Sequence, residues 1–268
     1  MKWTELTPTD FKKLAKDPGV CVVPLGSLER HGEHLPYGCD GLVAESIAAE
    51  AADRAGVVCF PVWYFGQVHE ASCFDGTVNF PPEMLIAMLR RLFSEIARNG
   101  FNKIVVFSGH GGNTDMLHFF DMSTLDEPRD YSLYCIGPDD GYLTGVERAK
   151  IAGLMETDIM GHADEEETSL FMGCCPDLVK FEYNRFEEPI PNMHKLDHLK
   201  GIHSGLWWYA MYPENVGGTP SAATEEKGKV MRGIYADALT RALETVKKDT
   251  EVKRLYDEFH ARRSKIGK

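Results

Sequence analysis

Apolar and polar residues are arranged along the first half of the chain in blocks of alternating period. Continuous apolar runs, typical of strands buried on both faces, cover residues 19–25, 57–62, 103–108 and 131–136. Apolar residues at helical spacing cover residues 42–55, 82–99 and 113–121. Gly56 and Gly100 directly follow the first two of these stretches, as expected at helix ends. The alternation predicts an α/β layered domain with a mostly parallel sheet.

The second half of the chain is less regular. Residues 137–216 contain many loop residues, and we expect them to pack over the strand ends instead of forming a separate domain. Residues 224–248 have the pattern of a long amphipathic helix. The prediction is a single domain, 1–268, in which the basic segment 249–268 forms a C-terminal helical extension.

Composition narrows the class of partner. The net charge of −12 disfavours a nucleic-acid groove and fits an enzyme that acts on a small neutral or cationic molecule. No window reaches the roughly 18 consecutive apolar residues of a membrane span, and no signal peptide is visible at the N-terminus. The seven cysteines are odd in number, which favours a reducing environment over a disulfide framework. We therefore predict a cytoplasmic protein with no membrane or nucleic-acid partner.

Polar side chains follow two of the predicted strands. Glu29 and His31 come after the first strand, Asp40 follows after a short loop, and His110 comes after the third strand between glycines. Sites in open α/β sheets gather beyond the carboxyl ends of the strands, and an extended segment would point Glu29 and His31 the same way. Such nitrogen and oxygen ligands suit zinc, manganese or iron, and Asp40 could bridge two ions that hold a hydroxide and polarise a carbonyl.

Other interpretations of these residues remain open. Glu29 and His31 could be polar loop groups, and Asp40 could cap the helix that follows it. His110 alone could be a histidine whose ring bonds to the backbone. Their clustering, and the glycines beside His110, favour the metal site.

A third cluster runs from His162 to Glu167. Glu165 and Glu166 are expected on a solvated helix face, whereas Glu167 precedes an apolar run and is a candidate fifth ligand or acid–base group. His162 could protonate a leaving amine or bind a developing oxyanion. Glu70, after the second strand, is a candidate for substrate binding, with a structural role as the alternative.

Taken in order, these motifs resemble the creatininase family of metal-dependent amidohydrolases, from Val20 to Gly228. The matching blocks are Pro24–Pro36 with Asp40, Gly76-Thr77, Gly109–Asn113, His162-Ala163 with Glu167–Ser169, Gly218–Pro220 and Ala223–Gly228. The resemblance implies a three-layer α/β/α fold with a mostly parallel central sheet. It also implies a homo-oligomer, often a hexamer, and a site with two divalent metal ions (Zn, Mn or Fe) that hydrolyses a C–N bond.

The resemblance also implies roles for individual residues. Glu29 and His31 would each bind one ion, Asp40 would bridge the two, and His110 would bind the ion shared with Glu29. The two catalytic residues implied are His162 and Glu167. His162 would lie beside the substrate, and Glu167 near the metals as a fifth ligand or as an acid–base group. The residues predicted to contact the substrate are Glu70, Gly111 and Asn113.

The chain departs from creatininase itself at several positions. Creatininase has a metal-binding Glu where this chain has Gly112, so the ligand must come from elsewhere, for which Glu167 is the candidate, or be water. Ala71 and Asp75 also differ from many relatives, and no tryptophan lies between Trp63 and Trp207. These differences disfavour creatinine as the substrate, and the Gly109–Asn113 segment looks more like the deformylase and peptide-processing branches.

The predicted function is therefore hydrolysis of an amide, formamide or cyclic amidine bond of a small molecule, other than a peptide bond, by a metal-bound hydroxide. Two alternatives remain open. The same site could serve a lactone or sugar-derivative hydrolase or isomerase, or the chain could be a metal- or ligand-binding member without catalysis.

Overall fold

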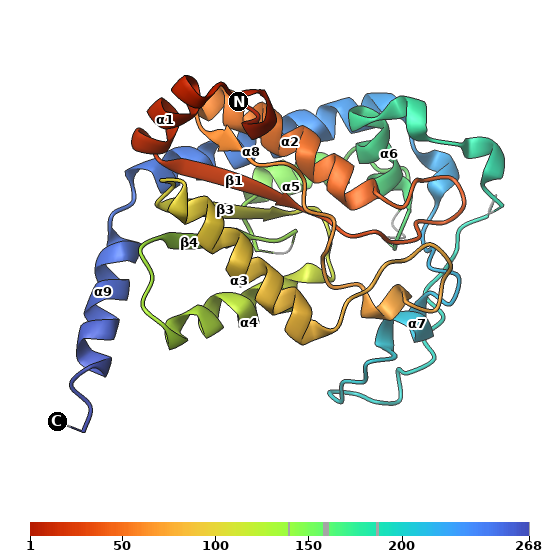
Figure 1. Ribbon diagram of the computed structural model, residues 1–268. Coiled ribbons are helices and arrows are strands. Elements are labelled where there is room, and N and C mark those ends of the chain that lie inside the picture. Colours follow the sequence, from red (N-terminus) through yellow and green to blue (C-terminus); the bar gives the residue numbers. More distant parts are fainter. Residues whose placement is uncertain (139, 158–160, 186–187, 268) are drawn as a thin grey trace.

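The computed structural model describes residues 1–138, 140–157, 161–185 and 188–267. Its centre is a sheet of parallel strands in the order β2-β1-β3-β4, which confirms the predicted α/β class (Figure 1). The strands are β1 (Val20–Leu25), β2 (Val58–Cys59), β3 (Lys103–Ser108) and β4 (Ser132–Ile136). The prediction for β2 was too long, since its regular ladder stops at Cys59, two residues before Pro61, which has no N–H to donate.

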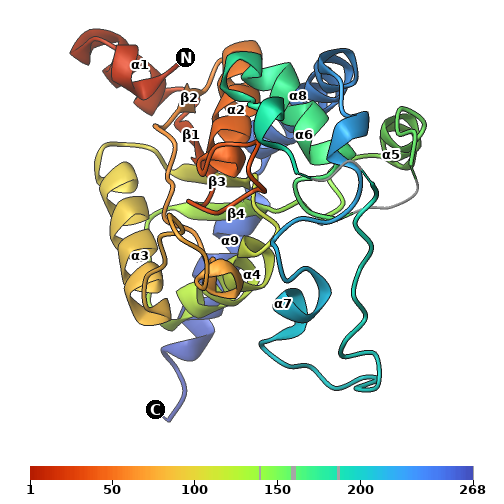
Figure 2. The same cartoon turned by 90° about the vertical axis from the view of Figure 1, so that its right-hand side faces the viewer.

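Helices cover both faces of the sheet, as Figure 2 shows. Successive residues of β1 point to opposite faces, so that Val22 packs in one apolar cluster and Val23 in another. The first cluster includes residues of α2 (Cys39–Ala55), α6 (Glu165–Cys174) and α8 (Glu225–Lys248). The second includes residues of α3 (Pro82–Arg98) and α4 (Asn113–Ser123). The implied three-layer α/β/α arrangement is thereby confirmed.

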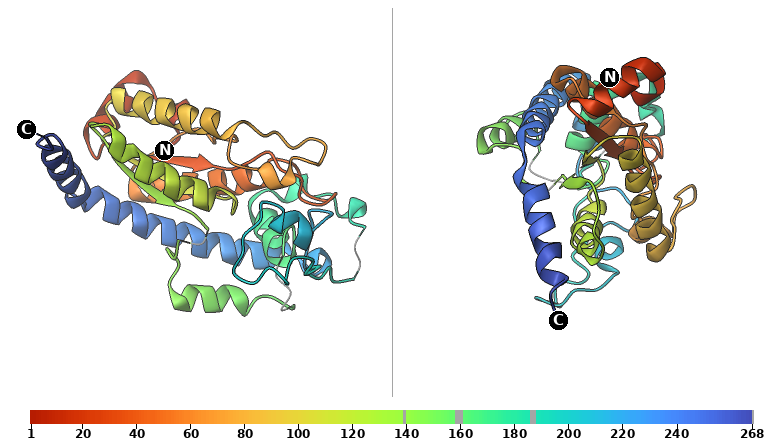
Figure 3. Two further views of the ribbon diagram at one scale, coloured as in Figure 1. Left: turned by 90° about the horizontal axis from the view of Figure 1, so that it is seen from below. Right: turned by 60° about the vertical axis from the view of Figure 1, so that its left-hand side comes forward.

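The described residues form four further helices at the edges of this core. They are α1 (Pro8–Lys16), α5 (Gly145–Ala152), α7 (Trp207–Met211) and α9 (Glu251–Arg263). Helix α5 was not predicted, although Thr144 and Glu147 form a capping box at its start. Helix α9 follows the long α8 and extends away from the sheet, so the segment expected as a helical extension is largely helical (Figure 3).

The short 3₁₀ helices are η1 (Trp3–Glu5), η2 (His69–Ala71), η3 (Thr124–Asp126), η4 (Pro176–Leu178), η5 (Phe181–Tyr183) and η6 (Pro220–Ala222). In the described residues, no helix has both the length and the apolar character of a membrane span.

Helices α6 and α8 approach closely because both carry glycine at their contact. A Cβ on Gly228 would lie 1.8 Å from the backbone oxygen of Ser169, and a Cβ on Gly173 would lie 2.2 Å from the carbonyl carbon of Gly228. No side chain fits there without moving one helix. This contact fixes α6, and α6 carries Glu167.

We expect Gly228→Ala to lower the free energy of unfolding by about 1–3 kcal/mol, because the added methyl overpacks the contact between α6 and α8. Gly233→Ala is the matched control in the same helix, since a Cβ there meets nothing within 4 Å. The control should be neutral or stabilise the protein by about 0.5–1 kcal/mol through helix propensity. Urea unfolding measures both, and equal effects of the two substitutions would contradict the tight contact.

Candidate metal centre

The candidate ligands come from segments at the carboxyl ends of β1 and β3. Glu29 and His31 lie in the loop after β1, Asp40 lies in the first turn of α2, and His110 follows β3. All four are at least 94% buried, with exposures between 1% and 6%. Glu167 reaches the same place from the first turn of α6, and its side chain is 30% exposed. The fold thus brings together the five residues predicted as ligands.

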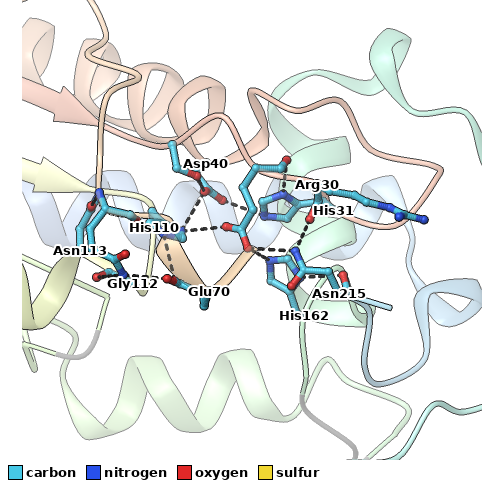
Figure 4. A network of polar contacts seen from close by, with 12 residues as sticks. Arg30, His31, Asp40, Glu70, His110, Gly112, Asn113, His162 and Asn215 are labelled. Atoms are coloured by element: carbon cyan, nitrogen blue, oxygen red, sulfur yellow. Dashed lines mark hydrogen bonds and ion pairs between the residues drawn. The ribbon is translucent and has the colours of Figure 1, made fainter. Parts of the chain in front are cut away.

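Asp40 lies at the centre of this cluster, between two imidazoles (Figure 4). Its Oδ1 is 3.0 Å from His31 Nε2, and its Oδ2 is 3.0 Å from His110 Nδ1. Glu29 Oε2 is 3.2 Å from His110 Nδ1, and Glu167 Oε1 is 3.3 Å from His31 Nε2. The five side chains therefore form two groups that share Asp40.

Groups of ligand atoms within 4.8 Å of one another support this arrangement. One such group is Glu29, Asp40 and His110. Two others combine His31 with Glu29 and His162, and with Cys39 and Asp40. Cys39 was not predicted at the site, and burial raises the pKa of its thiol well above the ordinary value, which disfavours the thiolate that binds metals.

The histidine rings are oriented by backbone carbonyls. His31 Nδ1 lies 3.1 Å from the oxygen of Glu29, and His110 Nε2 lies 2.8 Å from that of Gln67. With a proton on each of these nitrogens, the other nitrogen points into the cluster, where it can hold a second proton against the carboxylates or offer its lone pair to a metal ion. Glu29 Oε2 and His31 Nε2 are buried and have no hydrogen bond to the described residues. Buried polar atoms that make no hydrogen bond and face groups of opposite charge fit a bound cation.

The charges of the cluster are strongly coupled. Burial alone would lower the pKa of His110, but the carboxylates of Glu29 and Asp40 raise it to about 10. Burial alone would raise the pKa of Glu29, but the neighbouring imidazoles, His162 foremost, lower it to about 2. The buried carboxylates are therefore stabilised by nearby positive charge, which either protons on the imidazoles or metal ions can supply.

His162 lies beside the cluster and not in α6. Its Nε2 is 3.4 Å from Glu29 Oε1, and its ring centroid is 4.3 Å from that of His31. Ala163 has a positive φ of 52°, and its N–H donates to Glu167 Oε2 at 2.6 Å. This strained turn between His162 and α6 leaves Glu167 Oε1 free to face His31.

The neighbouring Glu165 corrects a prediction. It was expected on a solvated face, yet it is 2% exposed and accepts a hydrogen bond from Lys227 Nζ at 2.7 Å. Its partner lies on α8, which explains why local sequence did not indicate burial.

The two neighbouring glycines Gly111 and Gly112 differ in the space around them. A Cβ on Gly112 would lie 2.4 Å from Glu70 Oε1 and 2.6 Å from His110 Nε2. A Cβ on Gly111 would meet nothing within 4 Å. Glu70 is held by Gln67 Nε2, which donates to its Oε2 at 2.9 Å. A side chain at position 112 would therefore have to move both Glu70 and the ring of His110, which the backbone oxygen of Gln67 holds.

Asn113 is fully buried, and both ends of its amide contact the protein. Its Oδ1 accepts from the N–H of Gln67 at 2.8 Å, and its Nδ2 donates to Ser108 Oγ at 3.1 Å. These contacts place the Gln67 loop beside His110. They favour a positioning role, and the predicted direct contact of Asn113 with a substrate stays a prediction.

A cavity of about 860 Å³ opens over the cluster. It is lined by Glu29, His110, His162 and Glu167, and by Glu70 and Gly111 of the predicted substrate-binding residues. Several residues from 161–170 and 203–208, in the irregular second half of the chain, also line it. No Lys or Arg lines the described part of this cavity.

Sequence reasoning missed Gln67 and Asn215, which supply the carbonyls that orient His110 and His162. These two contacts come from backbone oxygens, which carry no residue-type signal. The side chain of Gln67 also contacts Glu70, and that of Asn215 contacts Glu29, which is far away in the sequence. The only indication for Asn215 was its place just before glycines and the Gly218–Pro220 block.

The parallel sheet and the buried cluster define an α/β protein with a candidate metal centre beyond its strand ends. A family model described as "Creatininase: Creatinine amidohydrolase" matches residues 4–243. The chain belongs to the creatininase family.

Curated relatives differ in what their names say they act on. The 3-dehydro-scyllo-inosose hydrolase of Thermotoga maritima is 27% identical over 264 residues, covering 91% of this chain and 81% of the relative. The mycofactocin precursor peptide peptidase of Mycobacterium ulcerans is 27% identical over 225 residues, covering 81% and 80%. The creatinine amidohydrolase of Pseudomonas putida is 25% identical over 260 residues, covering 89% and 94%.

Solved structures share the fold over nearly the whole chain. A structure from Bacteroides fragilis, described as a candidate creatinine amidohydrolase, has a TM-score of 0.76 and 26% identity, covering 93% of this chain and 97% of that one. A creatininase structure has a TM-score of 0.77 and 22% identity, covering 93% and 98%.

We expect Gly112→Ala to weaken Zn²⁺ binding by roughly tenfold or more, because its methyl would lie 2.6 Å from His110 Nε2 and push that ring away from the cluster. Gly111→Ala is the adjacent control and should leave Zn²⁺ affinity within about twofold, since its Cβ meets open space. Competition with a chelating dye measures both affinities. Equal affinities for the two variants would contradict the crowding at position 112.

Proposed function

We propose that this protein is a hydrolase that uses two divalent metal ions to cleave an amide, formamide or cyclic amidine C–N bond, other than a peptide bond, in a small molecule. The observation that carries the proposal is the position of Asp40, whose two oxygens each lie 3.0 Å from a different imidazole nitrogen. Membership of a family whose relatives are named as hydrolases supports it.

The two groups that share Asp40 would each hold one ion. Glu29, Asp40 and His110 would form one site, and His31, Asp40 and Glu167 the other. We propose Zn, Mn or Fe, in line with creatininase structures described as a Zn–Zn type and as a Mn form. Bound ions would make water acidic enough to act at neutral pH and would polarise the substrate's carbonyl.

His162 is the proposed acid or oxyanion-binding group. Its Nδ1 lies 2.9 Å from the backbone oxygen of Asn215, so its Nε2 faces the cluster and the cavity. Burial would lower the pKa of His162, but the carboxylate of Glu29 raises it, which favours a proton on Nε2. From there His162 can donate to a leaving nitrogen or to a developing oxyanion. Glu167 remains a candidate ligand or acid–base group, and its contact with His31 favours the ligand.

The substrate we propose is neutral or cationic. The described cavity lining has carboxylates beyond the proposed ligands, among them Glu70 and Asp115, and contains no Lys or Arg that would attract an anion. The volume of about 860 Å³ suits a small molecule. Glu70 and Gly111 lie where they could contact it. We also retain a cytoplasmic location and a homo-oligomer, such as a hexamer, as proposals.

A second candidate is hydrolysis of a lactone or other sugar derivative at the same site. The likeness to the 3-dehydro-scyllo-inosose hydrolase, over 91% of this chain, favours it. The same ligands and the same cavity would serve this reaction, so the substrate alone distinguishes the two candidates.

We expect the purified wild-type protein to hold about two transition-metal ions per chain. The Asp40→Asn variant should hold fewer than one ion per chain, because Asp40 belongs to both groups. The His31→Ala variant should hold one ion fewer than the wild type. His198→Ala is the control, since His198 is an exposed histidine outside the cluster. Elemental analysis after dialysis measures the content. Wild-type protein that binds none of Zn²⁺, Mn²⁺ or Fe²⁺ would contradict the proposal.

A substrate panel of formamides, small amides and cyclic amidines against lactones and dipeptides should separate the candidates. We expect kcat/KM for the best C–N substrate to exceed that for the best lactone by at least about tenfold, equal to about 1.4 kcal/mol. Amides that carry a carboxylate should react slowest. Chelation should abolish turnover and added metal should restore it, and a lactone as best substrate would favour the second candidate.

A further inference from the structure

We infer that Trp208 is a positioning residue, which holds Glu29 and His162 in place through Asn215. This inference rests on the proposed function, because it gives Trp208 a role in the proposed hydrolytic site. It begins from the indole N–H of Trp208, which donates to Asn215 Oδ1 at 2.7 Å.

The hydrogen bond fixes the orientation of the Asn215 amide. An indole N–H can only donate, so the atom that faces it must be the carbonyl oxygen of the amide. The amide nitrogen then points the other way, toward the loop after β1. Asn215 is fully buried and has a positive φ of 53°, a conformation that asparagine adopts more readily than most residues.

Asn215 contacts two of the proposed functional side chains (Figure 4). Its Nδ2 donates to Glu29 Oε1 at 3.0 Å and to the backbone oxygen of Arg30 at 2.6 Å. Its own backbone oxygen lies 2.9 Å from His162 Nδ1. Holding Glu29 Oε1 turns Oε2 toward His110, and holding His162 Nδ1 turns Nε2 toward the cluster.

Trp208 also faces the cavity. Its ring packs edge-to-face on His162, with centroids 5.3 Å apart and an interplanar angle of 85°. The same side chain thus forms part of the wall that a substrate would touch and, through Asn215, contacts the carboxylate of Glu29. Without the indole N–H, the buried Oδ1 would lose this hydrogen bond, and the amide could turn over and release Glu29.

Trp207 is the matched comparison within α7. It lines the same cavity and stacks edge-on against Trp208 at 5.3 Å, but it is 42% exposed. Its indole N–H makes no hydrogen bond to the part of the chain that the structure describes. The two tryptophans therefore differ in the one contact that the inference needs.

The test compares Trp208→Phe with Trp207→Phe in the full chain, with Co²⁺ as the probe. Competition with a chelator gives the Co²⁺ affinity, and visible absorption of bound Co²⁺ reports the ligand geometry. We expect Trp208→Phe to weaken binding by about tenfold and to change the spectrum, and Trp207→Phe to stay within about twofold of wild type. Thermal unfolding checks that both variants are folded. Wild-type affinity and spectrum in Trp208→Phe would overturn the inference.

Asn215→Ala and the double variant decide whether the effect passes through Asn215. The inference has Trp208 act on Glu29 through Asn215 and not through its packing on His162, so adding Trp208→Phe to Asn215→Ala should cause no further loss of Co²⁺ affinity. Additive losses would show that Trp208 acts by another route and would overturn the inference.

A second measurement needs no metal. In the metal-free protein, the indole N–H of Trp208 should exchange slowly with solvent, and Asn215→Ala should make it fast. Fast exchange in the wild type would mean that the hydrogen bond from Trp208 to Asn215 does not form, and would overturn the inference. Wild-type protein that binds no Co²⁺ but protects this proton would instead count against the proposed metal-dependent function alone.

Discussion

The arrangement of the site depends on one buried carboxylate, that of Asp40, held between two imidazoles. Two glycines allow Asp40 to come this close to the strand ends. A Cβ on Gly26 would lie 2.4 Å from Gly41 Cα, and a Cβ on Gly109 would lie 2.4 Å from the backbone oxygen of Asp40. The first turn of α2 therefore rests directly on the ends of β1 and β3. Its helix N-terminus favours a negative charge, and Ser27 donates to Asp40 Oδ2 at 2.6 Å.

Because the cluster is buried, its negative carboxylates need protons or metal ions beside them. Burial alone would raise the pKa of Asp40, yet His31 and His110 hold it well below its ordinary value. Buried carboxylates at this density are costly unless cations accompany them. In the metal-free state protonated imidazoles can serve, whereas metal ions require the neutral imidazole lone pairs. Binding of ions would thus release protons, which couples occupancy of the site to pH.

Local patterns predicted the parts of the molecule that depend on nearby residues. The bounds of β3 were correct at both ends, and those of α3 differed by one residue at its C-terminus, because burial and helix-ending signals lie within each segment. The pairing of Glu165 with Lys227 was missed because 62 residues separate the partners. Asn215 was missed because it orients His162 through its backbone oxygen and because 186 residues separate its amide from Glu29. The sequence thus indicated the residues that the fold gathers into the cluster better than the groups that orient them, and the role of these residues as ligands stays a prediction.

The glycine at position 112 connects ligand choice to substrate choice. The resemblance places a metal-binding Glu of creatininase at this position, but here His110 and Glu70 occupy the space that any side chain would need. Glu167, from α6, belongs to the other of the two groups that share Asp40, since its Oε1 lies 3.3 Å from His31. It therefore does not take the place beside His110 that the expected replacement ligand would fill. The carboxylate beside Gly112 is that of Glu70, whose Oε1 lies 3.8 Å from His110 Nε2. A Cβ on the neighbouring Gly111 would meet nothing within 4 Å, so this segment leaves open space at the edge of the cavity that would select the substrate.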